Sequence, residues 1–128
     1  MPLSPLPSPG PETHLGRLVQ PADANDHGTL FGGEAMRFMD EAAAVAAIRY
    51  AHGLVLTAHV DAIDFKTPVP IGVFLEATAR VVAVGRTSIA VEVILEAEDR
   101  HTAVRTITTT GRFVLVAVDA EGRPREVR

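Results

Sequence analysis

The sequence contains no cysteine and no tryptophan, and Tyr50 is its only tyrosine. Without cysteine the chain has no disulfide framework, no thiolate metal ligand and no thiol nucleophile. Few aromatics, a formal net charge of −4 and no basic stripe argue against a nucleic-acid binder. No His-x-x-x-His pair occurs, so we expect neither a metal site nor a cofactor, although His27, His59 and Asp61 could still meet in space.

Long apolar runs are also missing from the sequence. No stretch reaches the length of a transmembrane helix, and the amino terminus lacks the basic segment and apolar run of a signal peptide. We therefore expect a cytoplasmic protein without a membrane partner. The chain has 128 residues, of which 47% are hydrophobic, and this is enough for one domain with a substantial core.

Proline is concentrated at the amino terminus, where residues 1–13 alternate proline with small residues. Proline donates no backbone hydrogen bond, so we expect this arm to be extended or disordered. Residues 14–120 are expected to form the single domain, and residues 121–128 a polar carboxy-terminal tail.

A glycine-rich turn leads into one long helix. Residues 34–50 contain neither glycine nor proline and are dominated by strong helix formers, so the sequence predicts a helix over this range. His52-Gly53 supplies the stop, with Gly53 expected in the left-handed conformation. The helix is too apolar to lie on a surface, which suggests that a sheet wraps closely around it.

Five extended segments accompany the helix, one before it and four after it. They lie at residues 14–20, 54–65, 74–84, 87–98 and 103–118. In the second of these, Val60 and Ala62 alternate with Asp61 and Ile63. We predict an α+β domain in which the last four strands form an antiparallel meander. Since one helix cannot cover both faces of such a sheet, we expect a homodimer.

Asp40 is the unusual residue of the predicted helix. Its neighbours at spacings of three, four and seven are Met36 and three alanines, and Arg37 is the only charged one. A carboxylate in this setting lies either at the rim of a cleft, partly desolvated, or on a solvated edge beside Glu41.

Gly32 and Gly33 leave backbone N–H groups at the helix start without side-chain cover. Such groups and the helix dipole favour a negative oxygen, including a carbonyl that develops into an oxyanion. The glycines could also simply serve a tight turn. Asp40 would lie about 10 Å along the helix, so the two features would meet most easily if a second subunit brought its own helix start close.

Five motifs resemble those of the hotdog-fold acyl-CoA thioesterases, in particular the bacterial short- and medium-chain acyl-CoA hydrolases and the animal brain-type enzyme. They are Gln20-Pro-Ala-Asp-Ala-Asn25, Gly28-Thr-Leu-Phe-Gly-Gly33, Met39-Asp40-Glu41-Ala42, Val60-Asp-Ala-Ile-Asp-Phe65 and Pro68-Val-Pro-Ile-Gly72. The resemblance implies a hotdog fold, in which a curved antiparallel sheet of about five strands wraps one long central helix. It also implies a homodimer with two composite sites and a hexamer built as a trimer of dimers.

The resemblance also implies roles for individual residues. Asp40 matches the catalytic carboxylate, acting as general base on water or as nucleophile, and Asn25 matches an asparagine contributed by the opposite subunit. Gly32 and Gly33 would polarise the thioester carbonyl through their amides. Thr57, or a nearby strand residue, would help to hold Asp40 or the attacking water.

Basic and hydroxyl residues are candidates for contacts with coenzyme A. The turn Gly85-Arg86-Thr87-Ser88 resembles a strand turn that contacts nucleotide phosphates in several hotdog enzymes, and an ordinary hairpin with a solvated arginine is the alternative. Further candidates on electrostatic grounds are Lys66, Arg123 and Arg125.

Hydrolysis of an acyl-CoA in fatty acid metabolism is the leading functional hypothesis, with coenzyme A as part of the substrate and not a cofactor. A hydratase or dehydratase on the same fold usually presents a histidine with an acidic partner in a different motif, and Asn25 with Asp40 favours hydrolysis. A non-hydrolytic acyl-CoA binding or sensing module is a further alternative, and the sequence does not separate a weakly active binder from an enzyme.

Overall fold

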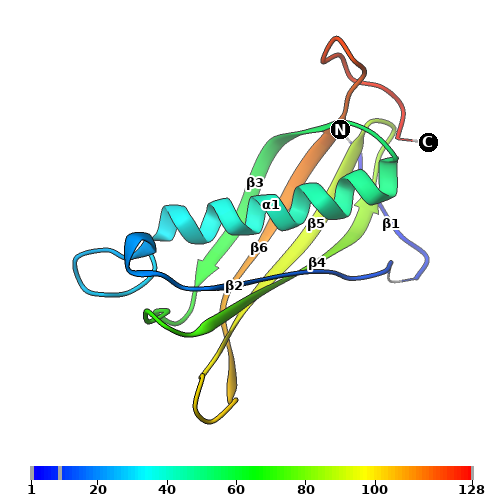
Figure 1. Cartoon of the computed structure of the whole chain (residues 1–128). Helices are drawn as coiled ribbons and strands as arrows, with labels where there is room; N and C mark the ends of the chain where they lie inside the picture. Colours follow the sequence, from blue (N-terminus) through cyan, green and yellow to red (C-terminus); the bar gives the residue numbers. More distant parts are fainter. Residues whose placement is uncertain (1, 9, 128) are drawn as a thin grey trace.

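The computed structural model describes residues 2–8 and 10–127 and shows one long helix lying against one curved sheet (Figure 1). The elements in chain order are β1 (Ser4–Pro5), β2 (Thr13–Leu18), the 3-10 helix η1 (Pro21–Asp23), α1 (Gly32–Ala51), β3 (Val55–Phe65), β4 (Phe74–Val84), β5 (Ser88–Glu98) and β6 (Arg105–Ala117). This is the hotdog architecture, so the predicted α+β class is confirmed; the sheet has six strands instead of about five because the arm adds β1.

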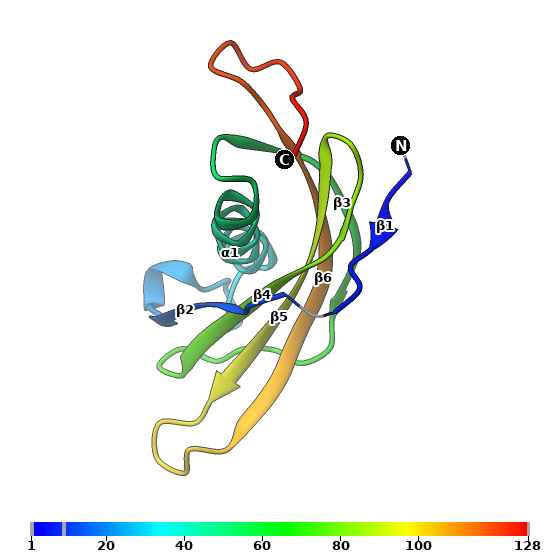
Figure 2. The same cartoon turned by 90° about the vertical axis from the view of Figure 1, so that its right-hand side faces the viewer.

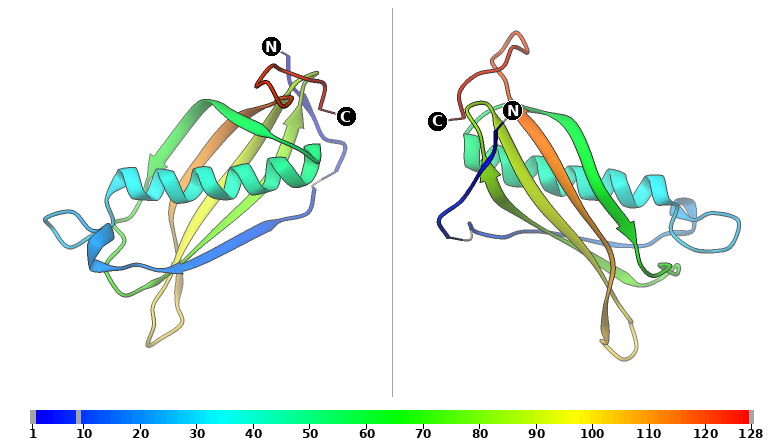
Figure 3. Two further views of the ribbon diagram at one scale, coloured as in Figure 1. Left: turned by 45° about the horizontal axis from the view of Figure 1, so that its top comes forward. Right: turned by 180° about the vertical axis from the view of Figure 1, so that it is seen from behind.

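Helix α1 fills the concave side of the sheet. Figure 2 shows α1 nearly end-on with the strands curving around it, and from behind the convex face of the sheet lies in front of α1 (Figure 3). Ala42, Ala43, Ala47 and Met39 of α1 are fully buried. Their mostly small side chains let the helix approach the strands closely. Among the described residues no helix, α1 included, has the length and hydropathy needed to cross a membrane.

The strand order is β1-β4-β5-β6-β3, with β2 pairing with β4 as well, and the pairings between these described strands are antiparallel. Strands β4, β5 and β6 form a meander, but β3 pairs with β6, so the predicted four-strand meander is wrong. The reason lies in the connection from β3 to β4, which carries Pro68 and Pro70 and docks on the segment before α1. There the Leu30 amide donates to the Val69 carbonyl at 2.7 Å, which prevents a tight turn back onto β3.

Strand β3 does not keep the alternation predicted for its second half. Ala62 has a positive φ of 53°, and the pairing with β6 shifts register between Asp61 and Asp64. Because this bulge inserts an extra residue, Val60 and Ile63 both pack against the core.

Helix α1 ends on a left-handed residue, but that residue is His52 (φ 55°, ψ 43°), so the prediction for Gly53 is wrong. The His52 amide donates to the Ile48 carbonyl at 2.7 Å. A Cβ at Gly53 would lie 2.6 Å from Nη2 of Arg125, so a larger residue there would displace this guanidinium. That guanidinium donates to the Ala51 carbonyl at 2.9 Å, so the carboxy-terminal tail caps the helix.

The proline-rich arm contains the short strand β1. Ser4 and Pro5 pair with Val84 and Ala83 at the end of β4. The next residue, Leu6, donates its amide to the Val82 carbonyl at 3.0 Å and packs against the core. The arm therefore adds a short strand beside the end of β4.

The close approach of α1 to the sheet predicts that its buried face will not accept a larger side chain. Ala47→Leu should lower the free energy of unfolding by about 1–3 kcal/mol, because a packed core must shift to make room. Glu41→Leu adds a similar side chain at an exposed position of the same helix and should change stability by less than about 0.5 kcal/mol. Denaturant unfolding at one protein concentration measures both, and equal losses would contradict the packing described here.

Candidate functional site

Asp40 points from α1 toward the edge strand β3. It is half-buried, and its Oδ1 accepts a hydrogen bond from the Thr57 hydroxyl at 2.7 Å. Arg37 instead approaches Glu34 and Glu41 along the helix surface, each at 3.9 Å. Of the two orientations that the sequence left open, the structure places Asp40 at the margin of the core and not on the solvated edge with Glu41.

The start of α1 presents backbone amides without protein partners. The N-cap residue Phe31 is extended and makes no side-chain cap. Within the part of the chain that the structure describes, no group accepts a hydrogen bond from the amide of Gly32 or Gly33. A Cβ added at Gly33 would meet nothing within 4 Å, whereas one at Gly32 would lie 3.7 Å from the ring of Phe65, so the open space lies beside Gly33. Two donors at the positive end of the helix dipole are thus available to an oxygen atom of a ligand.

Asn25 organises the loop that projects beyond the start of α1 (Figure 1). Its Oδ1 accepts hydrogen bonds from the amides of His27 (2.9 Å) and Thr29 (3.1 Å), and its Nδ2 donates to Oγ1 of Thr29 (3.0 Å). Gly28 in this loop has a φ of 80°, which favours glycine. An amide nitrogen carries two hydrogens, so Nδ2 keeps one donor for a further partner.

Two residues that the sequence analysis did not select hold the base of this loop. Asp23 is 9% exposed, and its Oδ2 accepts hydrogen bonds from the Gln20 amide at 2.9 Å and from Nη2 of Arg17 at 2.6 Å. These bonds, that of the Gln20 amide first, hold the pKa of Asp23 below its usual range. The acidic residue is visible in the motif, but its arginine partner comes from β2 and is recognisable only in three dimensions.

The candidate residues for coenzyme A lie at opposite ends of the sheet. Lys66 directly follows β3, whose last residue, Phe65, lies against the start of α1. The Nζ of Lys66 pairs with Oδ2 of Asp64 at 2.9 Å. The hairpin between β4 and β5 lies at the other end, next to both terminal segments (Figure 3). One chain therefore does not bring all the candidates together.

The hairpin between β4 and β5 is largely covered. Thr87 and Ser88 are only 3% and 2% exposed, and the amide of Val127 donates to the Arg86 carbonyl at 2.9 Å. A Cβ added at Gly85 would lie 2.5 Å from a carbonyl oxygen of the amino-terminal arm. Arg86 is the exposed residue of the turn, so it is the member that can reach a phosphate.

The two tail arginines differ in their surroundings. The guanidinium of Arg125 donates to the carbonyls of Ala51 (2.9 Å), Val118 (3.2 Å) and Glu126 (3.0 Å), which gives it a structural role in this chain. Arg123 is exposed, and its backbone amide donates to Oδ1 of Asp119 at 2.9 Å. Arg123 is therefore the tail residue with its charge at the surface.

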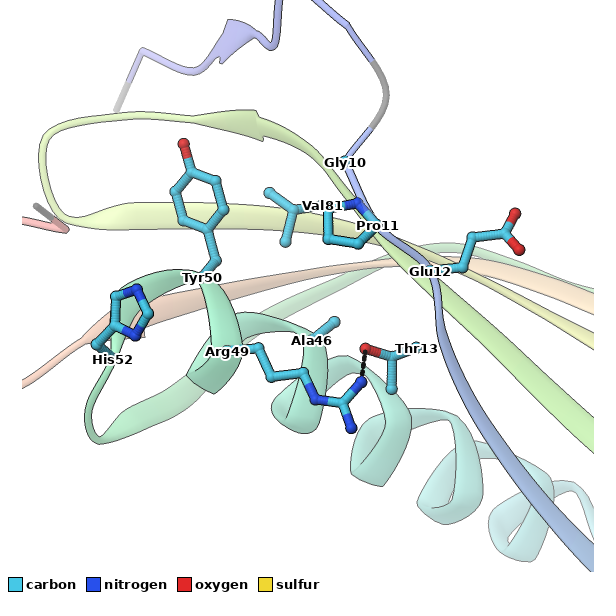
Figure 4. Close-up of a pocket in the computed structure, with 9 residues that line it drawn as sticks. All are labelled: Gly10, Pro11, Glu12, Thr13, Ala46, Arg49, Tyr50, His52 and Val81. Carbon is cyan, nitrogen blue, oxygen red and sulfur yellow. Dashed lines mark hydrogen bonds between the residues drawn. The ribbon is translucent and has the colours of Figure 1, made fainter.

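A cavity of about 210 Å³ lies between the amino-terminal arm, the last turns of α1 and β4 (Figure 4). Arg49 lines it and donates from Nη1 to Oγ1 of Thr13 at 3.2 Å. Arg49 follows Asp40 by nine residues, which places it on the opposite side of the helix. This cavity is thus separate from the group formed by Asp40 and Thr57.

Within residues 2–8 and 10–127, no three histidine, aspartate or glutamate side chains gather closely enough to hold a metal ion. His27 lies in the projecting loop beside Asp26, whereas His59 and Asp61 lie on β3. The candidate functional groups are therefore a carboxylate with its hydroxyl partner, an amide side chain and the backbone amides of a helix start.

Comparison with known proteins places the chain in a family. The profile of the thioesterase superfamily matches residues 27–104, which include Asp40 and Thr57. The chain belongs to the thioesterase superfamily. Within it, the acyl-CoA thioester hydrolase YciA of Salmonella typhimurium is 36% identical over 121 residues, which are 92% of this chain and 91% of that protein.

Solved structures of thioesterases share the fold of this superfamily member. The hexameric thioesterase y2039 from Yersinia pestis has a TM-score of 0.85 at 35% identity, covering 94% of this chain and 97% of that one. The acyl-CoA hydrolase of Staphylococcus aureus, in complex with butyryl coenzyme A, coenzyme A and coenzyme A disulfide, has a TM-score of 0.85 at 34% identity, covering 90% of this chain and 70% of that one. Structures of three variants of that hydrolase are also similar to this chain; in them an asparagine, an aspartate or a threonine is changed to alanine.

The lowered pKa of Asp23 predicts how stability depends on pH. Ionised Asp23 stabilises the fold above its unfolded pKa of about 4, and this contribution is lost as the pH falls through the lower folded value. Asp23→Asn should therefore lower Tm most near neutral pH, and the difference from wild type should shrink below about pH 4.

The matched control is Asp26→Asn, which neutralises a carboxylate that is 94% exposed in the same loop. It should change Tm little at any pH. A difference between Asp23→Asn and wild type that stays constant from about pH 3 to about pH 7 would contradict the stabilising role of the ionised carboxylate.

Proposed function

We propose that this protein hydrolyses acyl-CoA thioesters to a carboxylate and coenzyme A. The observation that carries the proposal is the half-buried Asp40 carboxylate, held by Thr57 at 2.7 Å in a chain with open amides at its helix start. The relatives described as acyl-CoA thioester hydrolase and acyl-CoA hydrolase support the substrate class. Coenzyme A is then part of the substrate, and the proposed reaction uses no separate cofactor.

The sequence separations of three residues support their proposed roles. Asn25 and Asp40 are 15 residues apart, and Asp40 and Thr57 are 17 residues apart. In the S. aureus acyl-CoA hydrolase, the asparagine, aspartate and threonine chosen for substitution are separated by the same 15 and 17 residues. We infer that these three positions correspond in the two chains.

Hydrolysis requires a water or carboxylate nucleophile and a place for the negative charge. Asp40 removes a proton from a water that attacks the carbonyl carbon, or attacks that carbon itself to form a mixed anhydride that water then hydrolyses. In both routes the carbonyl oxygen gains charge, which the amides of Gly32 and Gly33 stabilise. The carbon–sulfur bond then breaks, and the thiolate of coenzyme A takes up a proton. The Thr57 hydroxyl fixes one carboxylate oxygen and leaves Oδ2 of Asp40 for the reaction.

A second subunit completes the site in this proposal. Strand β3 ends the sheet, so its outer edge offers backbone groups for pairing. Leu54, Leu56 and Phe65, on or beside β3, are 60%, 56% and 53% exposed, which is unusual for large apolar side chains. An isologous homodimer covers this surface and brings the Asn25 loop of one subunit toward Asp40 of the other. The hexameric thioesterase y2039 supports a hexamer, which we propose to be a trimer of such dimers.

The exposed cations are the proposed contacts for the phosphates of coenzyme A. Arg86 at the hairpin and Arg123 in the tail have their charge at the surface, and Lys66 is held only by an exposed ion pair with Asp64. Because these residues lie at opposite ends of one chain, we expect one substrate to contact cations of two subunits. A cytoplasmic role in fatty acid metabolism would follow from this substrate.

Thiol release from acyl-CoAs of increasing chain length tests the proposal. Asp40→Asn keeps the shape of the side chain but removes its basicity, so it should lower kcat by about a hundredfold to ten-thousandfold. Asn25→Ala should also lower turnover, because water or substrate loses its orientation. Far-ultraviolet circular dichroism should show both variants folded as the wild type is.

Two substitutions of Thr57 provide a matched pair in the same assay. Thr57→Ser retains the hydroxyl that holds Asp40 and should retain most of the turnover, whereas Thr57→Val removes the hydroxyl at nearly constant size. Full turnover in Asp40→Asn would contradict the proposed chemistry. Acyl-CoA that binds to the wild type without being cleaved would instead favour a sensing module, and addition of water to an unsaturated acyl chain would favour a hydratase.

A further inference from the structure

We propose that Asp23 and Arg17 are positioning residues that fix the Asn25 loop relative to the start of α1. The inference rests on the proposed function, because the loop and the helix start carry Asn25 and the amides assigned to the reaction. Neither residue touches Asp40 or Thr57 through a hydrogen bond within the described part of the chain. Their effect on turnover would therefore act through the placement of other groups.

Asp23 joins both ends of the Asn25 loop. Its carboxylate receives Nη2 of Arg17 from β2 at 2.6 Å and the amide of Gln20 at 2.9 Å, which holds the chain entering the loop. Its backbone carbonyl accepts the amide of Phe31 at 2.9 Å, which holds the chain leaving the loop. Phe31 directly precedes Gly32, so one residue determines where the loop and the open amides lie with respect to each other.

Arg17 extends this connection to the body of the helix. Its guanidinium lies over the ring of Phe38, 5.6 Å from the centroid, so it contacts α1 as well as Asp23. The side chains of Arg17 and Asp23 are 25% and 12% exposed, compared with 46% and 62% for the surface pair of Lys66 and Asp64. Solvent therefore screens the Arg17–Asp23 pair less than the surface pair.

The interior of the loop does not supply the same restraint. The side-chain bonds of Asn25 reach only His27 and Thr29, so they set the internal shape of the loop. Its backbone is also tied by isolated bridges of Ala24 with Leu30 and of Thr29 with Pro70. The Thr29–Pro70 bridge and the bond from the Leu30 amide to the Val69 carbonyl hold the end of the loop on the β3–β4 connection, so loss of the Asp23 carboxylate releases its beginning. A displacement of about 1 Å there can cost up to about a hundredfold in rate.

A double-mutant cycle in full-length protein tests the proposal, with thiol release from butyryl coenzyme A as the assay. Asp23→Asn should lower kcat by about tenfold to a hundredfold with a smaller change in KM. In the Asn25→Ala background the same substitution should lower kcat by less than about threefold, because the group that it positions is already gone. Asp26→Asn is the control and should leave kcat within about twofold of wild type, since its carboxylate is exposed.

Amide hydrogen exchange gives a readout that does not depend on activity. Asp23→Asn should accelerate exchange in residues 24–31 and leave the buried centre of α1 unchanged, whereas Asp26→Asn should accelerate neither. Unchanged exchange in residues 24–31, or an equal loss of kcat in both backgrounds of the cycle, would overturn the positioning role. If the wild type cleaves no acyl-CoA, the proposed function fails, and the exchange experiment still decides whether Asp23 holds the loop.

Discussion

Packing of the alanine-rich face of α1 into the concave side of the sheet determines where the functional groups of this chain lie. Met39 and Ala43 are fully buried in that contact, while Asp40, between them in sequence, lies at its margin. A carboxylate in this place is partly removed from water yet close enough to β3 for the Thr57 hydroxyl to hold it. The start of the same helix lies beside Phe65 at the end of β3, with the positive end of its dipole at the open space beside Gly33.

In the proposed function, one chain alone lacks a complete catalytic site for two related reasons. Asp40 and the Asn25 loop are separated along α1, and the edge of β3 leaves large apolar side chains such as Leu54 and Leu56 in solvent. The isologous contact proposed along β3 would remove both deficits, because it would bury the apolar surface and bring complementary halves of two sites together. In the proposed dimer, the stability of the assembly and the construction of the site would depend on the same surface, which would also cover the sheet edge that a monomer has to protect.

Local sequence patterns predicted the helix and the five long strands because hydrophobic periodicity and turn residues act over short distances. They did not predict the partner of β3, which depends on a contact between Val69 and Leu30 across the fold. They also missed the bulge at Ala62, because its positive φ occurs at an alanine and not at a glycine, the residue that usually marks this conformation. Asp40 stood out as a charge on an apolar helix, but the pairing of Asp23 with Arg17 required the fold, because nothing in the spacing of the two residues points to it.

Mixing two inactive variants tests most directly whether the site is shared between subunits. Asn25→Ala and Asp40→Asn protomers are unfolded together and refolded, or co-expressed, and thiol release from butyryl coenzyme A is compared with that of each variant alone. If Asn25 and Asp40 come from different subunits, each mixed dimer has one intact site, and random pairing should restore about a quarter of wild-type turnover. If turnover stays at the level of the separate variants although mixed dimers form, both residues act within one chain and the composite site is wrong.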